Sequence, residues 1–154
     1  MRLLEKVAIV TGAGRGIGRA IARGFAREGA HVAIAEIDVP AGTEAAREVE
    51  ALGRRGLFIH TDMSRKEQID AMVARVLEQF GQIDILVNNA GVHISQPFLE
   101  VSEETYDRTL STNLRGPFFC AQAVTRHMVE RRRGKIIHMS SVYNKLCSMF
   151  SSLQ

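Results

Sequence analysis

Five short apolar runs alternate with four helical patterns along the chain, and this order restricts the fold more than any other feature. The expected strands are residues 7–11, 32–36, 57–61, 83–87 and 135–139, and the expected helices are residues 17–28, 41–52, 66–80 and 103 to about 132. The runs are almost continuously apolar, as strands are when both faces of a parallel sheet are covered. We therefore predict an α/β fold with a Rossmann-like, doubly wound parallel sheet of about five strands.

Two serines mark expected helix starts. Ser64 precedes Glu67 by three residues, and Ser102 precedes Thr105 with acidic residues in the first turn. A serine at this position accepts a hydrogen bond from a backbone N–H that the helix itself leaves unpaired. We expect both serines to cap the helices that follow them.

Composition and charge argue against several classes of protein. The 154 residues, 45% of them hydrophobic, suit one globular domain, and no apolar run is long enough for a membrane span. We therefore expect a cytoplasmic protein without a membrane partner. The net charge is only +3, and the basic cluster at residues 131–133 is interpreted as a solvated helix end rather than a nucleic-acid site. Cys120 and Cys147 form no C-x-x-C pair, which predicts neither a metal site nor a disulfide.

A glycine-rich turn follows the first expected strand. Residues 11–18 read TGAGRGIG, with glycines at 12, 16 and 18 in a Gly-x-x-x-Gly-x-Gly spacing. The spacing matches neither G-x-G-x-x-G nor a P-loop. Between a strand and a helix, such a turn presents backbone N–H groups to an anion such as a pyrophosphate. A tight strand-to-helix connection without a ligand is the alternative explanation.

The end of the second expected strand bears on the choice of nucleotide. Glu36 stands where an acid can accept a hydrogen bond from an adenosine ribose hydroxyl and repel a 2′-phosphate, which favours NAD over NADP. Asp38 is a second acid nearby. Arg15 argues in the opposite direction, because a cation in the glycine turn could hold that phosphate. We expect NAD as the cofactor and leave NADP open.

Three further stretches, together with this turn, make the chain resemble the short-chain dehydrogenase/reductase family of the classical type over residues 5 to about 142. They are Asp62-Met63 after the third strand, Asn-Asn-Ala-Gly at 88–91 after the fourth, and Asn-Leu-Arg-Gly at 113–116 in the long helix. The resemblance implies the following cofactor contacts: Gly12, Arg15, Gly16, Ile17, Gly18, Glu36, Asp62, Met63, Asn89, Ala90 and Gly91. It also implies catalytic roles for Asn113 and for Ser141, which follows the fifth strand.

The long helix contains a proline that affects Asn113. Pro117 has no N–H to donate to the carbonyl four residues back, and that carbonyl belongs to Asn113. We therefore expect the helix to be kinked there. The resemblance implies that the main chain of Asn113 holds a water in a proton relay, and a freed carbonyl would suit that role.

The family's Tyr-x-x-x-Lys pair is missing from the sequence. Tyr106 is followed at the fourth place by Leu110, and Tyr143 by Cys147. We interpret the chain as a C-terminally truncated member, with residues 1–145 forming the N-terminal part of one nucleotide-binding domain and residues 146–154 a tail unlike the family. The sheet is then expected to be incomplete at its C-terminal edge, exposing an apolar face and the strand at 135–139.

The leading functional hypothesis is therefore an NAD(P)-dependent oxidoreductase that interconverts a small-molecule alcohol and a ketone by hydride transfer. Loss of the Tyr-x-x-x-Lys pair predicts impaired turnover. A non-catalytic dinucleotide-binding or interaction protein is the main alternative. A methyltransferase using S-adenosylmethionine is a further one, since Gly14, Gly16 and Gly18 also fit a G-x-G-x-G turn. His93, Ser95 and Gln96 could line a pocket mouth, and the sequence leaves a homo-oligomer open.

Overall fold

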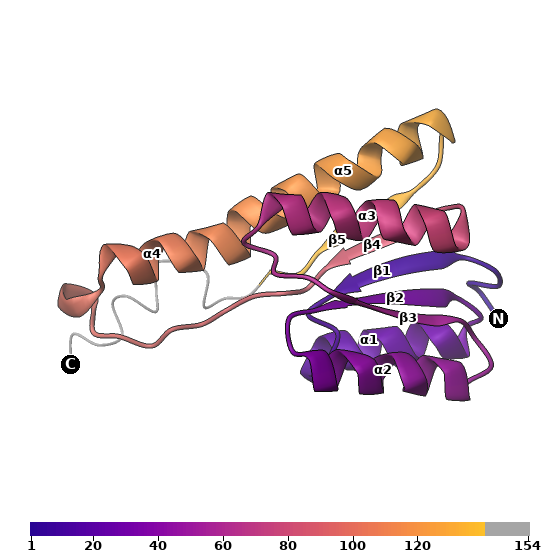
Figure 1. Ribbon diagram of the computed structural model, residues 1–154, viewed down its shortest axis with the longest axis horizontal. Helices are drawn as coiled ribbons and strands as arrows, with labels where there is room; N and C mark the ends of the chain where they lie inside the picture. The colour runs from indigo at the N-terminus through magenta and orange to yellow at the C-terminus, as the bar shows by residue number, and fades with distance from the viewer. Residues whose placement is uncertain (141–154) are drawn as a thin grey trace.

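All five apolar runs form strands of one parallel sheet (Figure 1). The computed structural model describes residues 1–140. The strands are β1 Val7–Thr11, β2 His31–Glu36, β3 Gly56–His60, β4 Ile85–Asn88 and β5 Lys135–His138, in the spatial order β3-β2-β1-β4-β5. Each lies within two residues of its predicted range. The predicted Rossmann-like sheet is confirmed, and its parallel pairs run from β1 with β2 and β4 outward.

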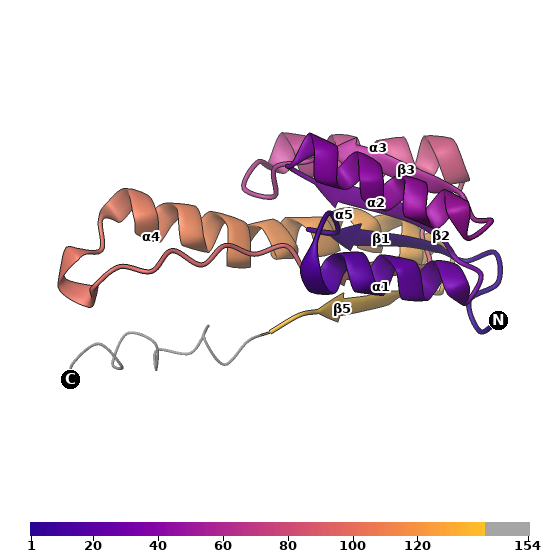
Figure 2. The same cartoon turned by 90° about the horizontal axis from the view of Figure 1, so that it is seen from below.

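Helices cover both faces of the sheet, as the continuous apolar runs predicted (Figures 1 and 2). Helices α1 Gly16–Arg27 and α2 Val39–Ala51 lie on one face, and α3 Lys66–Phe80 and α5 Gly116–Glu130 lie on the other. Within β1, Ala8 and Val10 belong to the core cluster of α1 and α2, whereas Val7 and Ile9 belong to that of α3 and α5. Successive strand residues point to opposite faces, so both kinds of position have to be apolar.

The strand order reverses at β1, and this position determines where a ligand can bind. The chain runs outward from β1 to β2 and β3, then returns through α3 to place β4 on the other side of β1. The loops after β1 and β4 therefore leave the sheet in opposite directions, which opens a crevice at the carboxyl ends of these two strands. Open α/β sheets bind their ligands in this crevice.

The long predicted helix is interrupted near Asn113. After the short helix η1 Phe98–Glu100, the chain forms α4 Glu103–Leu110, then a π-helical turn η2 Ser111–Arg115, and then α5. Pro117 lies in the first turn of α5. The expected disturbance of the helix is thus present as a π-turn, in which the N–H of Gly116 bonds to the carbonyl of Ser111 five residues back. Helices α4 and α5 form a long arm that extends beyond the sheet (Figure 1).

One of the two predicted caps is confirmed and the other is wrong. The Ser102 hydroxyl accepts a hydrogen bond of 3.2 Å from the N–H of Thr105 at the start of α4. Ser64 does not cap α3, whose first flanking residue is Arg65 and has no side-chain cap. The Ser64 hydroxyl instead donates to the Asp62 carboxylate at 2.7 Å. Because the same carboxylate also accepts from the Ser64 N–H at 2.9 Å, Ser64 belongs to the turn that Asp62 closes and not to the start of α3.

Strand β5 forms one edge of the described sheet, and its side chains are largely exposed. Ile137 and the following Met139 are each 43% exposed, and Phe118 on α5 is 61% exposed, so apolar surface is present where we expected it. In the basic cluster Arg132 and Arg133 are exposed, as expected of a solvated helix end, whereas Arg131 is half-buried and pairs with the buried carboxylate of Asp84 at 3.3 Å. No helix within residues 1–140 is long and apolar enough to cross a membrane.

Candidate functional site

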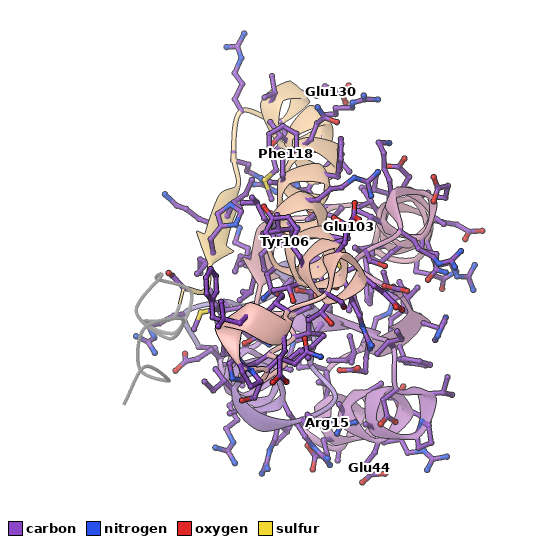
Figure 3. The ribbon with its side chains drawn as sticks, turned by 90° about the vertical axis from the view of Figure 1, so that its left-hand side faces the viewer. Arg15, Glu44, Glu103, Tyr106, Phe118 and Glu130 are labelled. Atoms are coloured by element: carbon purple, nitrogen blue, oxygen red, sulfur yellow. The ribbon has the colours of Figure 1, made fainter. Side chains whose placement is uncertain are left out.

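A cleft of about 500 Å³ lies at the carboxyl ends of β1 to β4, in the crevice that the topology creates. Its walls include every residue predicted to bind the cofactor except Gly16 and Gly18: Gly12, Arg15, Ile17, Glu36, Asp62, Met63, Asn89, Ala90 and Gly91. Figure 3 views the molecule from this end. It labels Arg15, which directly precedes α1, and also Tyr106 and Phe118, which lie on the α4–α5 arm. The segments at the carboxyl ends of four strands thus line one cleft.

The glycine turn packs so closely that side chains would not fit. Gly12 has a φ of +62°, and a Cβ built on it would lie 2.8 Å from the Cα of Ala90. A Cβ on Gly18 would lie 2.3 Å from the carbonyl oxygen of Gly12. Gly18 therefore supports the turn from behind, which explains why it does not line the cleft. The α1 helix begins without a side-chain cap, so its first N–H groups are left to a ligand or solvent.

Thr11 and Asn89 fasten this turn to the end of β4. The Thr11 hydroxyl oxygen accepts hydrogen bonds of 3.0 Å from the N–H groups of Asn89 and of Ala90. In return the Asn89 side-chain amide donates to the carbonyls of Thr11 and Gly12, at 3.0 and 3.1 Å. The contribution of Thr11 was missed from the sequence. The sequence feature that could have indicated it is a threonine at the end of an otherwise apolar strand.

Glu36 is buried, and its carboxylate collects three backbone N–H groups. One oxygen accepts from Gly14 at 2.9 Å, and the other accepts from Ile37 at 2.9 Å and from Asp38 at 3.1 Å. Asp38 caps α2 by accepting from the N–H of Ala41 at 3.0 Å, and its second oxygen pairs with the guanidinium of Arg15. The three charged groups discussed for nucleotide choice therefore lie together.

Asp62 and Met63 form another wall of the cleft. Met63 is 5% exposed, and Gly116 at the start of α5 lies so close that a Cβ there would be 2.3 Å from the Met63 carbonyl oxygen. Arg115 donates to the carbonyl of Ser64 at 3.0 Å. This wall is thus fixed by the π-turn and by the first residues of α5.

A second hollow, of about 990 Å³, continues the cleft toward β5 and contains Asn113. The two hollows share Ile17 and residues 89–92. The Asn113 side chain pairs with the backbone of Val92 in both directions, its Oδ1 accepting at 2.8 Å and its Nδ2 donating at 2.8 Å. The side chain of Asn113 thus positions the loop after β4. Ser141, the other predicted catalytic residue, lies outside the described residues, as does the predicted tail.

Asn88 and His138 line the second hollow without having been predicted as site residues. The Asn88 amide nitrogen donates to the Pro117 carbonyl at 3.2 Å and lies 3.4 Å from Nδ1 of His138. Its Oδ1 is buried and has no hydrogen-bond partner within residues 1–140. His138 could have been noticed as an imidazole at the carboxyl end of a strand, although nothing local separates it from any other strand-end histidine.

Cys120 lies in the core of α5, and burial raises the pKa of its thiol to about 12. A thiol of this kind stays protonated and unreactive at neutral pH. No group of three or more metal-ligating side chains occurs within the described part of the chain.

The fold and this cleft define an α/β protein of the Rossmann type, a class whose ligands bind at the carboxyl end of the sheet. The sequence pattern described as short chain dehydrogenase matches residues 6–152, and the chain belongs to that family. This membership sets the methyltransferase hypothesis aside.

Individual relatives agree with the assignment. Galactitol 2-dehydrogenase of Agrobacterium fabrum is 47% identical over 142 residues, which are 92% of this chain and 54% of the relative. The crystal structure of NAD+-bound xylitol dehydrogenase superposes with a TM-score of 0.90 at 29% identity, covering 99% of this chain and 61% of that one. A metagenomic short-chain oxidoreductase in complex with NADP has a TM-score of 0.88 and 36% identity, covering 94% and 66%. The chain spans about half the length of galactitol 2-dehydrogenase.

Proposed function

We propose that this chain forms the NAD(H)-binding part of a dehydrogenase that interconverts a polyol and the corresponding ketone. The observation that carries the proposal is the continuous cleft from Glu36 to Asn113, whose two hollows of about 500 and 990 Å³ share one wall and suit a dinucleotide together with a small substrate. Galactitol and xylitol, which name two of the similar proteins, are both polyols.

Each part of the cleft has a chemical task in this proposal. The free N–H groups at the start of α1 receive the pyrophosphate, and Glu36 accepts a hydrogen bond from a ribose hydroxyl. The Glu36 oxygen bonded to Gly14 has one N–H donor, so it retains room for a second one. Asp62 and Met63 lie on the adenine side. Bound NAD(H) supplies or accepts the hydride.

Asn113 and Ser141 are the proposed contributions of this chain to the reaction itself. Asn113 holds Val92 with its side chain, which leaves its main chain as the part that could order a water in the second hollow. Ser141 would donate a hydrogen bond to the substrate oxygen. No Tyr-x-x-x-Lys occurs among the 154 residues, so we expect turnover roughly 10²- to 10⁴-fold below that of a protein with such an acid/base pair.

Binding without turnover is the second candidate function, and the missing Tyr-x-x-x-Lys pair is the observation that favours it. Two measurements separate the candidates. NADH fluorescence reports binding, and the rise in NADH absorbance after addition of NAD+ with galactitol or xylitol reports turnover. Binding with polyol-dependent reduction supports the dehydrogenase, and binding without reduction supports the second candidate. Absence of NADH binding would contradict both.

Glu36→Ala provides the residue-level test of the cofactor assignment, with Glu44→Ala on α2 as its control. Both changes remove one negative charge, but Glu44 pairs with Arg19 and Arg47 at 3.9 Å and does not line the cleft. We expect Glu36→Ala to shift the ratio of NADH to NADPH affinity toward NADPH and Glu44→Ala to leave it unchanged. An unchanged ratio in Glu36→Ala would rule out the assigned role.

A further inference from the structure

We infer that Asp38 is a second determinant of nucleotide choice, because it occupies Arg15 and so withholds that cation from the 2′-phosphate of NADP. This inference rests on the proposed dinucleotide binding. Two carboxylates then act against the 2′-phosphate of NADP in different ways. Glu36 accepts the hydrogen bonds of three backbone N–H groups, and Asp38 pairs with the guanidinium of Arg15.

The first half of this arrangement is the N–H cluster around Glu36. Gly14, Ile37 and Asp38 direct three backbone N–H groups at one buried carboxylate, over 2.9 to 3.1 Å. Converging backbone N–H groups form a binding site for anions, including phosphate. In this chain the site already contains an anion of its own, and that anion is attached to β2.

The second half is the ion pair between Arg15 and Asp38. The Arg15 side chain is 72% exposed and lines the cleft together with Glu36 and Ile37, so its guanidinium can reach a ligand there. A hydrogen bond to the Asp38 carboxylate holds this guanidinium. The next cation on α1, Arg19, is taken by Glu48 through two hydrogen bonds of 2.9 and 2.8 Å. A 2′-phosphate would therefore have to displace Asp38 to gain Arg15.

The exposure of the pair decides how strong the exclusion is. An exposed ion pair is weak on its own, so Asp38 does not lock Arg15 irreversibly. A phosphate with a charge of about −2 would nevertheless meet both carboxylates before it gained the guanidinium. Removing the Asp38 charge should therefore tighten NADPH binding about 5-fold through the release of Arg15, the upper end for an exposed pair, and about 2-fold through the lost repulsion, which is about 10-fold together.

Asp38→Asn is the informative substitution. Asparagine caps a helix about as well as aspartate, so α2 should keep the hydrogen bond from Ala41 while the negative charge is lost. Glu44→Gln on the same helix is the matched control, because it removes the same charge from a residue that does not contact Arg15.

The test is a double-mutant cycle on the 154-residue chain. The dissociation constants of NADPH and NADH are measured for wild type, Asp38→Asn, Arg15→Met and the double variant. We expect Asp38→Asn to tighten NADPH about 10-fold in the presence of Arg15 but only about 2-fold in its absence, with NADH changed by less than about 2-fold. Glu44→Gln should leave both constants unchanged.

Two results would overturn the inference. The first is an equal NADPH gain in both Arg15 backgrounds, which would mean that Asp38 acts through its charge alone. The second is no gain at all in Asp38→Asn. Arg108 also lines the cleft, from α4, so Arg108→Met is made as well, and a gain that depends on Arg108 instead of Arg15 would likewise contradict the assignment. Failure of the proposed function has a different signature, namely that wild type binds neither NADH nor NADPH.

Discussion

Two glycines in one helix allow the tight packing of the glycine turn to be measured. Gly18 and Gly24 both lie in α1, so replacing either by alanine should gain about 1 kcal/mol from helix propensity. Their surroundings differ. A Cβ on Gly18 would lie 2.3 Å from the Gly12 carbonyl oxygen and 2.5 Å from the Asn89 amide nitrogen, whereas one on Gly24 would meet no atom within 4 Å beyond the adjoining backbone of its own helix.

The difference between the two variants therefore isolates the steric cost at Gly18. Forcing a methyl group into a packed site costs about 1–3 kcal/mol, and here the obstacles include backbone that cannot move without breaking the hydrogen bond from Asn89. We expect Gly24→Ala to raise the melting temperature by about 2–4 °C, on the scale for a domain of this size. Gly18→Ala should melt roughly 3–10 °C below Gly24→Ala.

Urea unfolding followed by circular dichroism gives the free energies of unfolding, and NADH titration gives a second readout. Gly18→Ala should also weaken NADH binding, because the methyl group pushes the Gly12 carbonyl out of the turn, while Gly24→Ala should bind as wild type does. Equal stability and equal NADH affinity in the two alanine variants would refute the close packing described for this turn.

Three further predictions concern the rest of the molecule. Asp84→Ala should lower the free energy of unfolding by about 1–3 kcal/mol in urea, since it removes the acceptor of a buried β1 N–H, and an unchanged midpoint would argue against this contact. Hydrogen bonds from Arg19 hold the pKa of Glu48 below its usual value, so the stability that this pair contributes is present at neutral pH and is lost as the pH falls through that lowered pKa. Glu48→Gln should therefore unfold at lower urea than wild type at neutral pH and at the same urea at acid pH, and a constant gap would contradict the ionic origin. In a Cys147→Ser background, Cys120 should react with a thiol reagent at mildly alkaline pH only after unfolding, and rapid labelling of the folded chain would be incompatible with its burial.

The sequence predicted the sheet well because each strand is apolar on both faces. Strands of this kind are typical of a parallel sheet that is covered on both faces, and the apolar runs predicted the strand ends to within two residues. The Ser64 cap failed because Asp62, two residues before it, accepts from both the hydroxyl and the N–H of Ser64 and holds this serine in the turn before α3. The π-turn was anticipated only as a disturbance near Pro117, since the proline signals a missing hydrogen bond but not how the helix accommodates it.

The sequence predicted most of the residues that line the cleft, but it did not predict the contacts between them. The glycine spacing and the acid at the end of β2 identify Gly12 and Glu36, because each needs a particular residue type at a particular distance along the chain. The ion pair between Arg15 and Asp38 could not be predicted from the sequence. The sequence shows both charged residues but not the distance between them in the folded chain. The same limit applies to Thr11, whose two hydrogen-bond donors lie 78 and 79 residues further along the chain.

We propose that the glycine turn and the loops after β2, β3 and β4 form one nucleotide-binding cleft. The most direct test is an NMR titration of the 15N-labelled chain with NADH, following the backbone amide signals. We expect the shifted amides to lie within residues 12–18, 36–38, 62–63 and 89–91, with Gly14 and Gly16 among them. Amide shifts confined to the α4–α5 arm, or no shifts at saturating NADH, would contradict it.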